Sequence, residues 1–356
     1  MSRRIPMTFR APQYIIRDNF TDSVAAPLPS TRICVPGPGQ LTITDTGNNL
    51  SISGDKLQIG GGASVWGNPG GYGAAMSRVA GRALLARFEK TATTTFGLAL
   101  GWINNTRNDS DSGDYNEGFI AFRNAASIMT RFNTTYVTHG VYAANTTYQV
   151  AVVLRTVGYF VLIKGGVFSN WTLIWVANNG NTATLRPAFA NYNAVGTLDD
   201  LQVVDLPGPW ASDYGIALYR GLNPSISTNV SVPIDHVTEF TFTHGSASNT
   251  DILFRYVDTN NFYKIICRST DGLIAITRTV AGVQNTLVQS SAGITTGATY
   301  RVVLTVEGSI FKAYLNNLLQ LSITDGTYLS ATQMQVLGPT SPSELVVWPR
   351  TIAIPG

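Results

Sequence analysis

The amino-acid sequence predicts an all-β chain of two tandem antiparallel β-sandwiches behind a short extended N-terminal arm. Three observations support this fold class. The chain has 356 residues, which exceeds one ordinary sandwich and suits two, because domains usually have about 100–200 residues. No segment shows sustained helical periodicity, whereas apolar residues alternate over short runs bounded by Gly, Asn and Asp. The two halves of the sequence also resemble one another.

The predicted strands are short and regularly spaced, as is typical of sandwiches. In the first half they include 50–53, 96–102, 148–154 and 159–164. In the second half they include 240–243, 252–257, 263–268, 300–306 and 311–315.

An internal repeat predicts the domain organisation. The matching segments, each a strand or a pair of strands around a Gly-containing turn, are 145–164 with 297–315, 117–123 with 261–266, and 200–207 with 344–349. Because the spacing between them is nearly constant, we interpret them as two copies of one domain. The predicted limits are an arm over 1–16, a first sandwich with long rim loops over 17–207, a linker over 208–216, and a second sandwich over 217–356.

Composition excludes several classes of function. Charged residues make up 13% of the chain, against about 25% in an average soluble domain, so the polar surface is mostly hydroxyl and amide. The net charge is +3 without a basic stripe, which argues against nucleic-acid binding. No apolar run approaches the roughly 18 residues of a membrane helix, so no membrane insertion is expected. The N-terminus lacks the apolar core of a secretory signal, which predicts synthesis in the cytoplasm without export by that route.

The segment 299–318 resembles the hairpin of concanavalin A-like and laminin G-like jelly-roll domains, and the segments 17–23 and 50–57 resemble the start of such modules in phage structural proteins. The resemblance covers about residues 17–207 and 212–352 and implies two jelly rolls. It says little about function, because this fold carries lectins, glycanases and scaffolds alike.

The sequence does not predict catalysis. A glycanase on this fold needs two carboxylates that flank the scissile bond, and the jelly-roll glucanase family places them as Glu-x-Asp-x-x-Glu; no segment of this sequence matches that pattern. The acidic cluster Asp109, Asp111, Asp114 and Glu117 falls in a predicted loop. It is either a solvated polar loop or a calcium site, since Ca²⁺ binds several carboxylate and carbonyl oxygens. Apart from this calcium hypothesis, no cofactor is expected.

Four aromatic residues are the predicted ligand-binding residues: Trp66, Tyr72, Trp102 and Tyr115. They lie in or beside two predicted rim loops that also carry amide and carboxylate groups. Aromatic faces stack on the apolar side of a pyranose, so a glycan site is one interpretation. For Trp66 and Tyr72 the alternative is that they pack on a neighbouring domain or subunit.

The arm carries the apolar residues Phe9, Tyr14, Ile15 and Ile16, which predict docking onto a partner; the alternative is a frayed terminus. Together these features favour a non-enzymatic virion structural protein, a tail appendage or capsid decoration. Such a protein would form a homo-oligomer, contact other virion proteins and present a surface that binds a cell-surface glycan. A free carbohydrate-binding lectin is the alternative, and the missing carboxylate pair disfavours a glycan hydrolase.

Overall fold

The computed structural model describes residues 13–62, 64–106, 115, 117–132, 135–224, 229–245, 249–337 and 340–354. The predicted fold class is confirmed, because antiparallel strands form four sheets in this described part. Contacts divide the chain into two compact units. Unit 1 contains the residues up to Trp171, Asn178–Gly215 and those from Ala353 on, and unit 2 contains Thr172–Ala177 and Ile216–Ile352.

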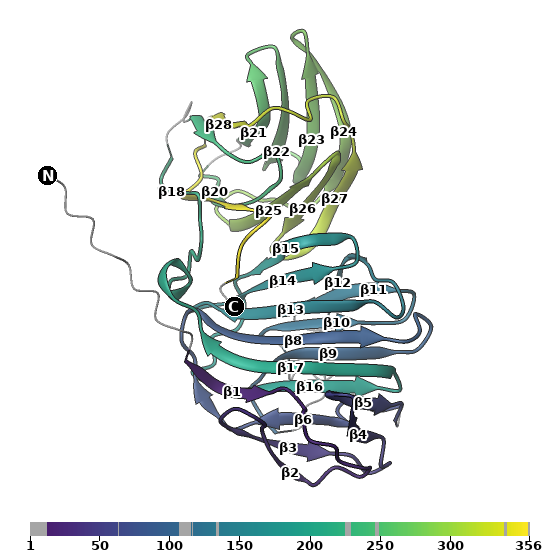
Figure 1. Cartoon of the computed structure of the whole chain (residues 1–356). Coiled ribbons are helices and arrows are strands. Elements are labelled where there is room, and N and C mark those ends of the chain that lie inside the picture. The colour runs from purple at the N-terminus through teal and green to yellow at the C-terminus, as the bar shows by residue number, and fades with distance from the viewer. Residues whose placement is uncertain are drawn as a thin grey trace, which may run out of the picture. The chain divides into compact units, whose positions relative to one another are not determined.

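Unit 1 is built on two sheets (Figure 1). Sheet 1 has the order β15 (Phe168–Ala177), β14 (Tyr159–Gly165), β13 (Thr147–Leu154), β8 (Arg82–Lys90), β17 (Val195–Asp205), β5 (Lys56–Gly60) and β4 (Leu50–Ser53), with β1 (Tyr14–Asp18) also paired to β17. Sheet 2 has the order β12 (Thr135–Val141), β11 (Ser127–Phe132), β10 (Phe119–Phe122), β9 (Gly97–Ile103), β16 (Thr184–Tyr192), β6 (Gly70–Gly73), β3 (Gln40–Thr44) and β2 (Thr31–Ile33), with β7 (Met76–Ser77) also paired to β16.

Sheets 1 and 2 pack face to face. Trp102 of β9 is fully buried and donates its indole N–H to the carbonyl oxygen of Val152 on β13 at 3.0 Å. The ring of Phe122 on β10 lies 5.8 Å from that of Phe88 on β8 and 5.2 Å from that of Tyr148 on β13, measured between centroids. Side chains that alternate along each strand thus reach the opposite sheet, which is the geometry of a sandwich core.

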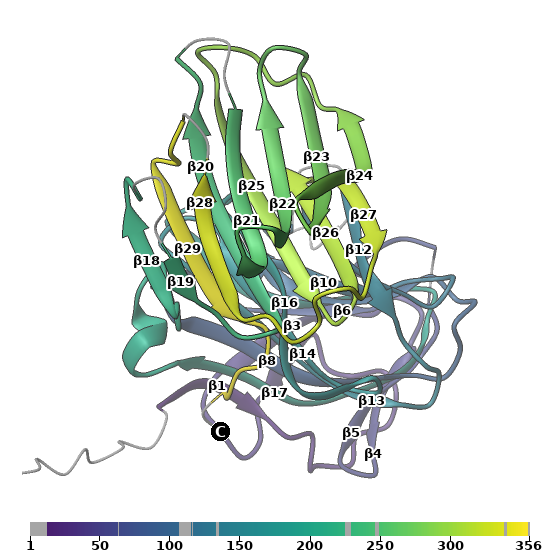
Figure 2. The same ribbon diagram turned by 90° about the horizontal axis from the view of Figure 1, so that it is seen from above.

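Unit 2 is a second sandwich, seen from above in Figure 2. Sheet 3 has the order β18 (Tyr219–Leu222), β29 (Glu344–Pro349), β20 (His236–Thr243), β25 (Thr299–Glu307), β26 (Ile310–Leu315) and β27 (Leu318–Thr324). Sheet 4 has the order β19 (Asn229–Ser231), β28 (Gln333–Leu337), β21 (Asn249–Asp258), β22 (Asn261–Arg268), β23 (Leu273–Val280) and β24 (Val283–Ser291). Their inner faces share one apolar core.

The strand orders of the two units correspond. The series β14-β13-β8-β17 of sheet 1 has the same connections as β26-β25-β20-β29 of sheet 3. The series β12-β11-β10-β9-β16 of sheet 2 likewise matches β24-β23-β22-β21-β28 of sheet 4. The repeated segments of the sequence fall on equivalent strands in this scheme, for example 145–164 on β13–β14 and 297–315 on β25–β26.

Two segments differ from what the predicted limits suggest. Part of the predicted linker forms the 3-10 helix η2 (Gly208–Ala211), whose Trp210 is buried with its ring centroid 6.0 Å from that of Phe160 in the same unit. The segment Thr172–Ala177, placed in the first domain by the sequence, groups with unit 2. There the ring of Trp175 lies 5.0 Å from that of Tyr314.

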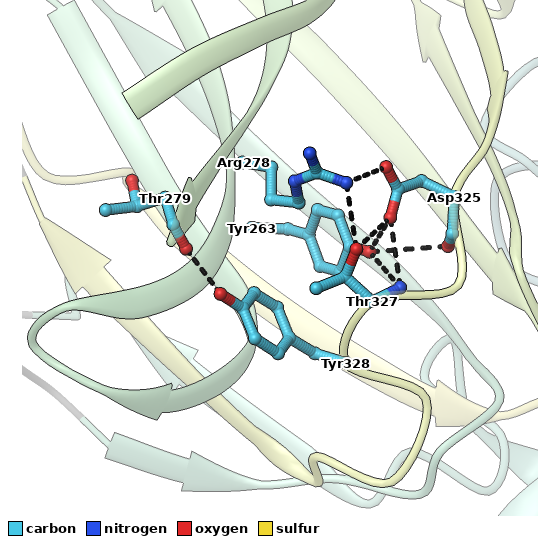
Figure 3. A network of polar contacts seen from close by, with 6 residues as sticks. All are labelled: Tyr263, Arg278, Thr279, Asp325, Thr327 and Tyr328. Carbon is cyan, nitrogen blue, oxygen red and sulfur yellow. Dashed lines mark hydrogen bonds and ion pairs between the residues drawn. The ribbon is translucent and has the colours of Figure 1, made fainter. Parts of the chain in front are cut away.

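A polar network joins the two sheets of unit 2 (Figure 3). Tyr263 on β22 packs its ring 4.8 Å from that of Phe311 on β26 and donates its hydroxyl hydrogen to the carboxylate of Asp325, which follows β27. The backbone N–H of Thr327 donates to the Tyr263 hydroxyl at 2.9 Å, and Arg278 on β23 donates to Asp325 Oδ2 at 2.6 Å. The network therefore holds the loop after β27 against sheet 4.

Both cysteines, Cys34 and Cys267, are buried free thiols. Within the described ranges the chain has no helix with the length and apolarity needed to cross a bilayer.

Candidate functional site: a pocket on the outer face of sheet 1

A pocket of about 160 Å³ opens on the face of sheet 1 that points away from the sandwich core. Its walls come from four adjacent strands, β13, β8, β17 and β1, together with β15 and a residue near the C-terminus (Figure 1). The lining residues are Tyr14, Leu85, Ala86, Arg87, Gln149, Val150, Trp171, Asp200, Gln202, Val204 and Ile354.

Strand register explains why residues distant in sequence meet here. Gln149 of β13 lies opposite Arg87 of β8, Leu85 of β8 lies opposite Gln202 of β17, and Val204 of β17 lies opposite Tyr14 of β1. Directly opposed residues on antiparallel strands project from the same face. Polar and aromatic groups from four strands therefore form one continuous surface.

A β-bulge shapes the polar wall of the pocket. The register between β17 and β8 shifts between Asp199 and Gln202, and Asp200 has a φ of 51°. Neighbouring residues of a regular strand point to opposite faces, whereas a bulge redirects a side chain. As a result Asp199 and Asp200 both approach Arg87, with N···O distances of 4.0 and 3.3 Å. Gln202 also donates a hydrogen bond from its amide to Asp200.

This wall is partly sheltered from water. Burial raises the pKa of the Asp199 carboxyl above its ordinary value, although the backbone hydrogen bond of Asp200 and the charge of Arg87 oppose the rise. Hydrogen bonds to a partly desolvated wall are stronger than those formed in bulk water. The pocket thus offers a carboxylate, a guanidinium and two amides beside the rings of Trp171 and Tyr14.

The structure brings together three of the four predicted aromatic residues, but not as an exposed site. Trp66 and Tyr115 lie in one cluster on the outer face of sheet 2, with Tyr72 packed against it. Trp66 is 4% exposed and Tyr115 is fully buried. Trp102 points the other way, into the core between the sheets. Burial of Trp66, Trp102 and Tyr115 therefore contradicts their prediction as ligand-binding residues, while Tyr72 is half-buried.

The physical reason is a floor of small residues on that outer face. The floor consists of Ala99, Ala121, Ala188, Ala190 and two glycines, Gly97 and Gly101. A β-carbon added to Gly97 would lie 2.4 Å from Cη2 of Trp66, and one added to Gly101 would lie 2.7 Å from Cδ1 of Tyr115. The rings of Trp66 and Tyr115 therefore pack on the small residues of their own sheet.

The predicted acidic cluster is described only at Glu117, because Asp109, Asp111 and Asp114 lie outside the described residues. Glu117 is buried and forms an ion pair with Arg78, while Thr182 Oγ1 donates to its Oε1 at 2.6 Å. Its carboxylate is thus occupied by protein groups, which corrects its assignment to a calcium site. No group of three or more His, Cys, Asp or Glu side chains suited to a metal occurs in the described part of the chain.

The predicted docking residues are also reassigned in part. Phe9 lies outside the described residues. Tyr14, Ile15 and Ile16 belong to β1, which pairs with β17 of unit 1. Ile16 is 3% exposed in the core of its own unit, so the expectation that it docks onto a partner is wrong, and Tyr14 lines the pocket.

Sequence reasoning missed most of the pocket. Arg87, Gln149 and Gln202 occupy polar positions that alternate with apolar ones, which is also the pattern of any solvated sheet face. The one available signal was the consecutive pair Asp199–Asp200 inside a strand pattern, because two adjacent carboxylates break the alternation and mark a bulge.

Comparison with known proteins gives remote structural likeness only. No family model and no curated protein sequence matches the chain. Among solved structures, it is similar to carbohydrate-binding module CBM66 from Bacillus subtilis (TM-score 0.28, 18% identity, 36% of this chain and 83% of that one). It is also similar to sheep galectin-11 (TM-score 0.31, 12% identity, 35% of this chain and 99% of that one). A third similar structure is galectin LEC-6 of Caenorhabditis elegans (TM-score 0.32, 13% identity, 36% of this chain and 95% of that one). Likeness at this level assigns no ligand to the chain.

Proposed function

We propose that this chain is a non-enzymatic binding protein whose sheet 1 pocket holds one residue of a saccharide. The observation that carries the proposal is the composition of the pocket: two aromatic rings, Trp171 and Tyr14, beside Arg87, Gln149, Asp200 and Gln202. A sugar ring stacks its apolar face on an aromatic side chain, and its hydroxyls need both donors and acceptors. This lining supplies all of these groups in one place.

The size of the pocket supports a single ring. Sites for drug-sized ligands usually have about 300–1,000 Å³, whereas this pocket has about 160 Å³. A terminal or branching sugar could enter it while the rest of the glycan stays in solvent.

The lining supports binding over hydrolysis. Glycoside hydrolysis commonly uses two carboxyl groups on either side of the scissile bond, about 5–9.5 Å apart. Among the residues that line this pocket, Asp200 is the single carboxylate, and it is held by Arg87 and Gln202. A carboxylate engaged in this way orients a ligand hydroxyl better than it transfers a proton.

A glycan array probed with the purified full chain tests the proposal, followed by titration calorimetry with the best ligand. We expect Trp171→Ala to raise Kd by about 10–100-fold, since 1.4 kcal/mol corresponds to a tenfold change and buried aromatic contacts are worth 1–3 kcal/mol. Phe96→Ala, an exposed ring that does not line the pocket, is the matched control and should bind normally. Absence of any glycan ligand, or an unaffected Trp171→Ala variant, would refute the proposal.

We further propose that the two sandwiches are copies of one domain displayed on a virion, as an oligomer in contact with other virion proteins. The surface poor in charge, the matching strand orders of the two units and the resemblance of residues 17–23 to phage modules support this. Mass spectrometry of purified particles and light scattering of the isolated chain test it. A monomer absent from every particle fraction would instead support a free lectin.

A further inference from the structure

We propose that the ligand of this pocket is an acidic sugar residue, with Arg17 and Lys164 as the groups that recognise its carboxylate. This inference rests on the proposed saccharide function and adds the chemical class of the ligand. It follows from which cations around the pocket already have partners and which do not.

Arg87 is the cation inside the pocket, and it is already neutralised. Asp200 and Asp199 lie 3.3 and 4.0 Å from its guanidinium. Farther along the same strand, Glu89 pairs with Lys56 at 3.6 Å, so these two charges offset each other. None of these cations is available to a ligand carboxylate without breaking an existing ion pair.

Arg17 lies beside the pocket on the β1 side. It is opposite Gln202, a pocket residue, in the register between β1 and β17, and its guanidinium carbon lies 4.6 Å above the ring centroid of Tyr14, another pocket residue. Asp18 and Leu201 form the next pair and are buried. Because neighbouring residues of a strand point to opposite faces, Arg17 and Gln202 lie on the outer face.

Arg17 also lacks a charged partner. Its Nε is buried without a hydrogen-bond acceptor, and within the part of the chain that the structure describes no carboxylate lies within ion-pair distance of it. A buried donor without an acceptor destabilises the protein, because the group has lost its hydrogen bonds to water. A guanidinium has the planar fork that binds a carboxylate through two hydrogen bonds. A carboxylate ligand at this position would therefore offset a cost that the empty protein bears.

Lys164 lies on the β14 side. It is opposite Gln149 in the register between β13 and β14, so the ammonium and the pocket amide project from the same face. The described residues provide no ion-pair partner for Lys164 either. Counting Arg17, Lys164 and Arg87 against Asp199 and Asp200 leaves one net positive charge around the pocket, which attracts an anion.

The test compares two ligands that differ only in the acidic residue, sialyllactose and lactose, with a disaccharide containing glucuronic acid as a second acidic probe. Binding is measured by calorimetry with the full chain at 0.05 M and 0.5 M salt. We expect sialyllactose or the glucuronide to bind at least tenfold more tightly than lactose, and this preference to fall at high salt because the charges are screened. Whichever acidic probe binds shows which kind of carboxylated sugar the pocket accepts.

The variants separate recognition of the carboxylate from binding of the sugar. Arg17→Gln and Lys164→Gln should each weaken binding of the acidic ligand severalfold more than binding of lactose. Arg268→Gln, at an exposed position of unit 2, is the charge-matched control. Circular dichroism tests whether each variant is folded. If Arg17→Gln does not fold, Lys164→Gln still decides the question. Equal binding of lactose and the acidic probes, unaffected by these changes, would overturn the acidic-sugar inference while the saccharide function stands. No binding of any sugar, or binding insensitive to Trp171→Ala, would overturn both.

Discussion

Replacing Trp66 with alanine should destabilise the protein. The molecules that remain folded should bind the ligand as tightly as before. The indole is 4% exposed, lies over Gly97, and has its ring centroid 5.6 Å from that of Tyr192. Truncating a buried Trp or Phe to Ala usually costs about 3–5 kcal/mol, because packing is lost and a cavity remains. Here the floor below the ring is glycine, which has no side chain to fill the space, so we expect a value in that range.

Urea unfolding followed by far-UV circular dichroism measures this cost, since tryptophan fluorescence changes when the residue is removed. The slope against urea concentration should stay constant, so that the shift of the midpoint reports stability. Val167→Ala, at a position 77% exposed, is the control and should change stability by less than about 0.5 kcal/mol. A cost below about 1 kcal/mol for Trp66→Ala, accompanied by loss of glycan binding, would refute this reasoning and restore the prediction that Trp66 binds a ligand.

Gly97→Ala provides an independent check of the same contact. The added β-carbon would lie 2.4 Å from Cη2 of Trp66, so the ring must move, and overpacking of this kind costs about 1–3 kcal/mol. Combining it with Trp66→Phe, a smaller ring, should cost less than the sum of the single changes, because the two residues contact each other. Simple additivity would show that Trp66 does not rest on Gly97.

Three further predictions concern buried groups. Burial lowers the pKa of Lys90 to about 8 in the folded protein, below its value of about 10.5 in the unfolded chain. Between pH 8 and about 10.5 the unfolded chain therefore binds a proton at Lys90 that the folded protein does not bind. Stability should therefore rise by about 2 kcal/mol from pH 7.5 to 9.5, and urea midpoints of Lys90→Met should lack this rise. Burial raises the pKa of Asp325, but hydrogen bonds, of which that from Tyr263 is the largest, lower the pKa overall. The contribution of Asp325 to stability is therefore lost as pH falls below about 4. Tyr263→Phe should move this loss of stability to higher pH in a circular-dichroism titration and should cost about 1–3 kcal/mol. Trp175→Ala should cost about 3–5 kcal/mol and speed proteolysis within Ile216–Ile352, since its ring packs on Tyr314; an unchanged cleavage rate would contradict this.

The alternation of apolar residues by itself determines the fold class of this chain. In β4 the apolar residues Leu50 and Ile52 alternate with serines, which is the pattern of a strand with one buried face. The matching segments 145–164 and 297–315 likewise indicate hairpins, which the protein contains as β13–β14 and β25–β26. These are local properties, because the period of a strand and the residues of its turns depend on near neighbours in the chain.

Only the tertiary structure decided what each face contacts. Alternation assigns Trp102 and Ile103 to opposite faces of β9, but it does not say which face another sheet covers or that a loop carrying Trp66 folds over the other. The same holds for the pocket: Tyr14 and Gln202 are distant in the sequence and meet because β1 pairs with β17. Strand pairing between distant segments depends on the packing of the whole sandwich, so no local pattern in the sequence encodes it.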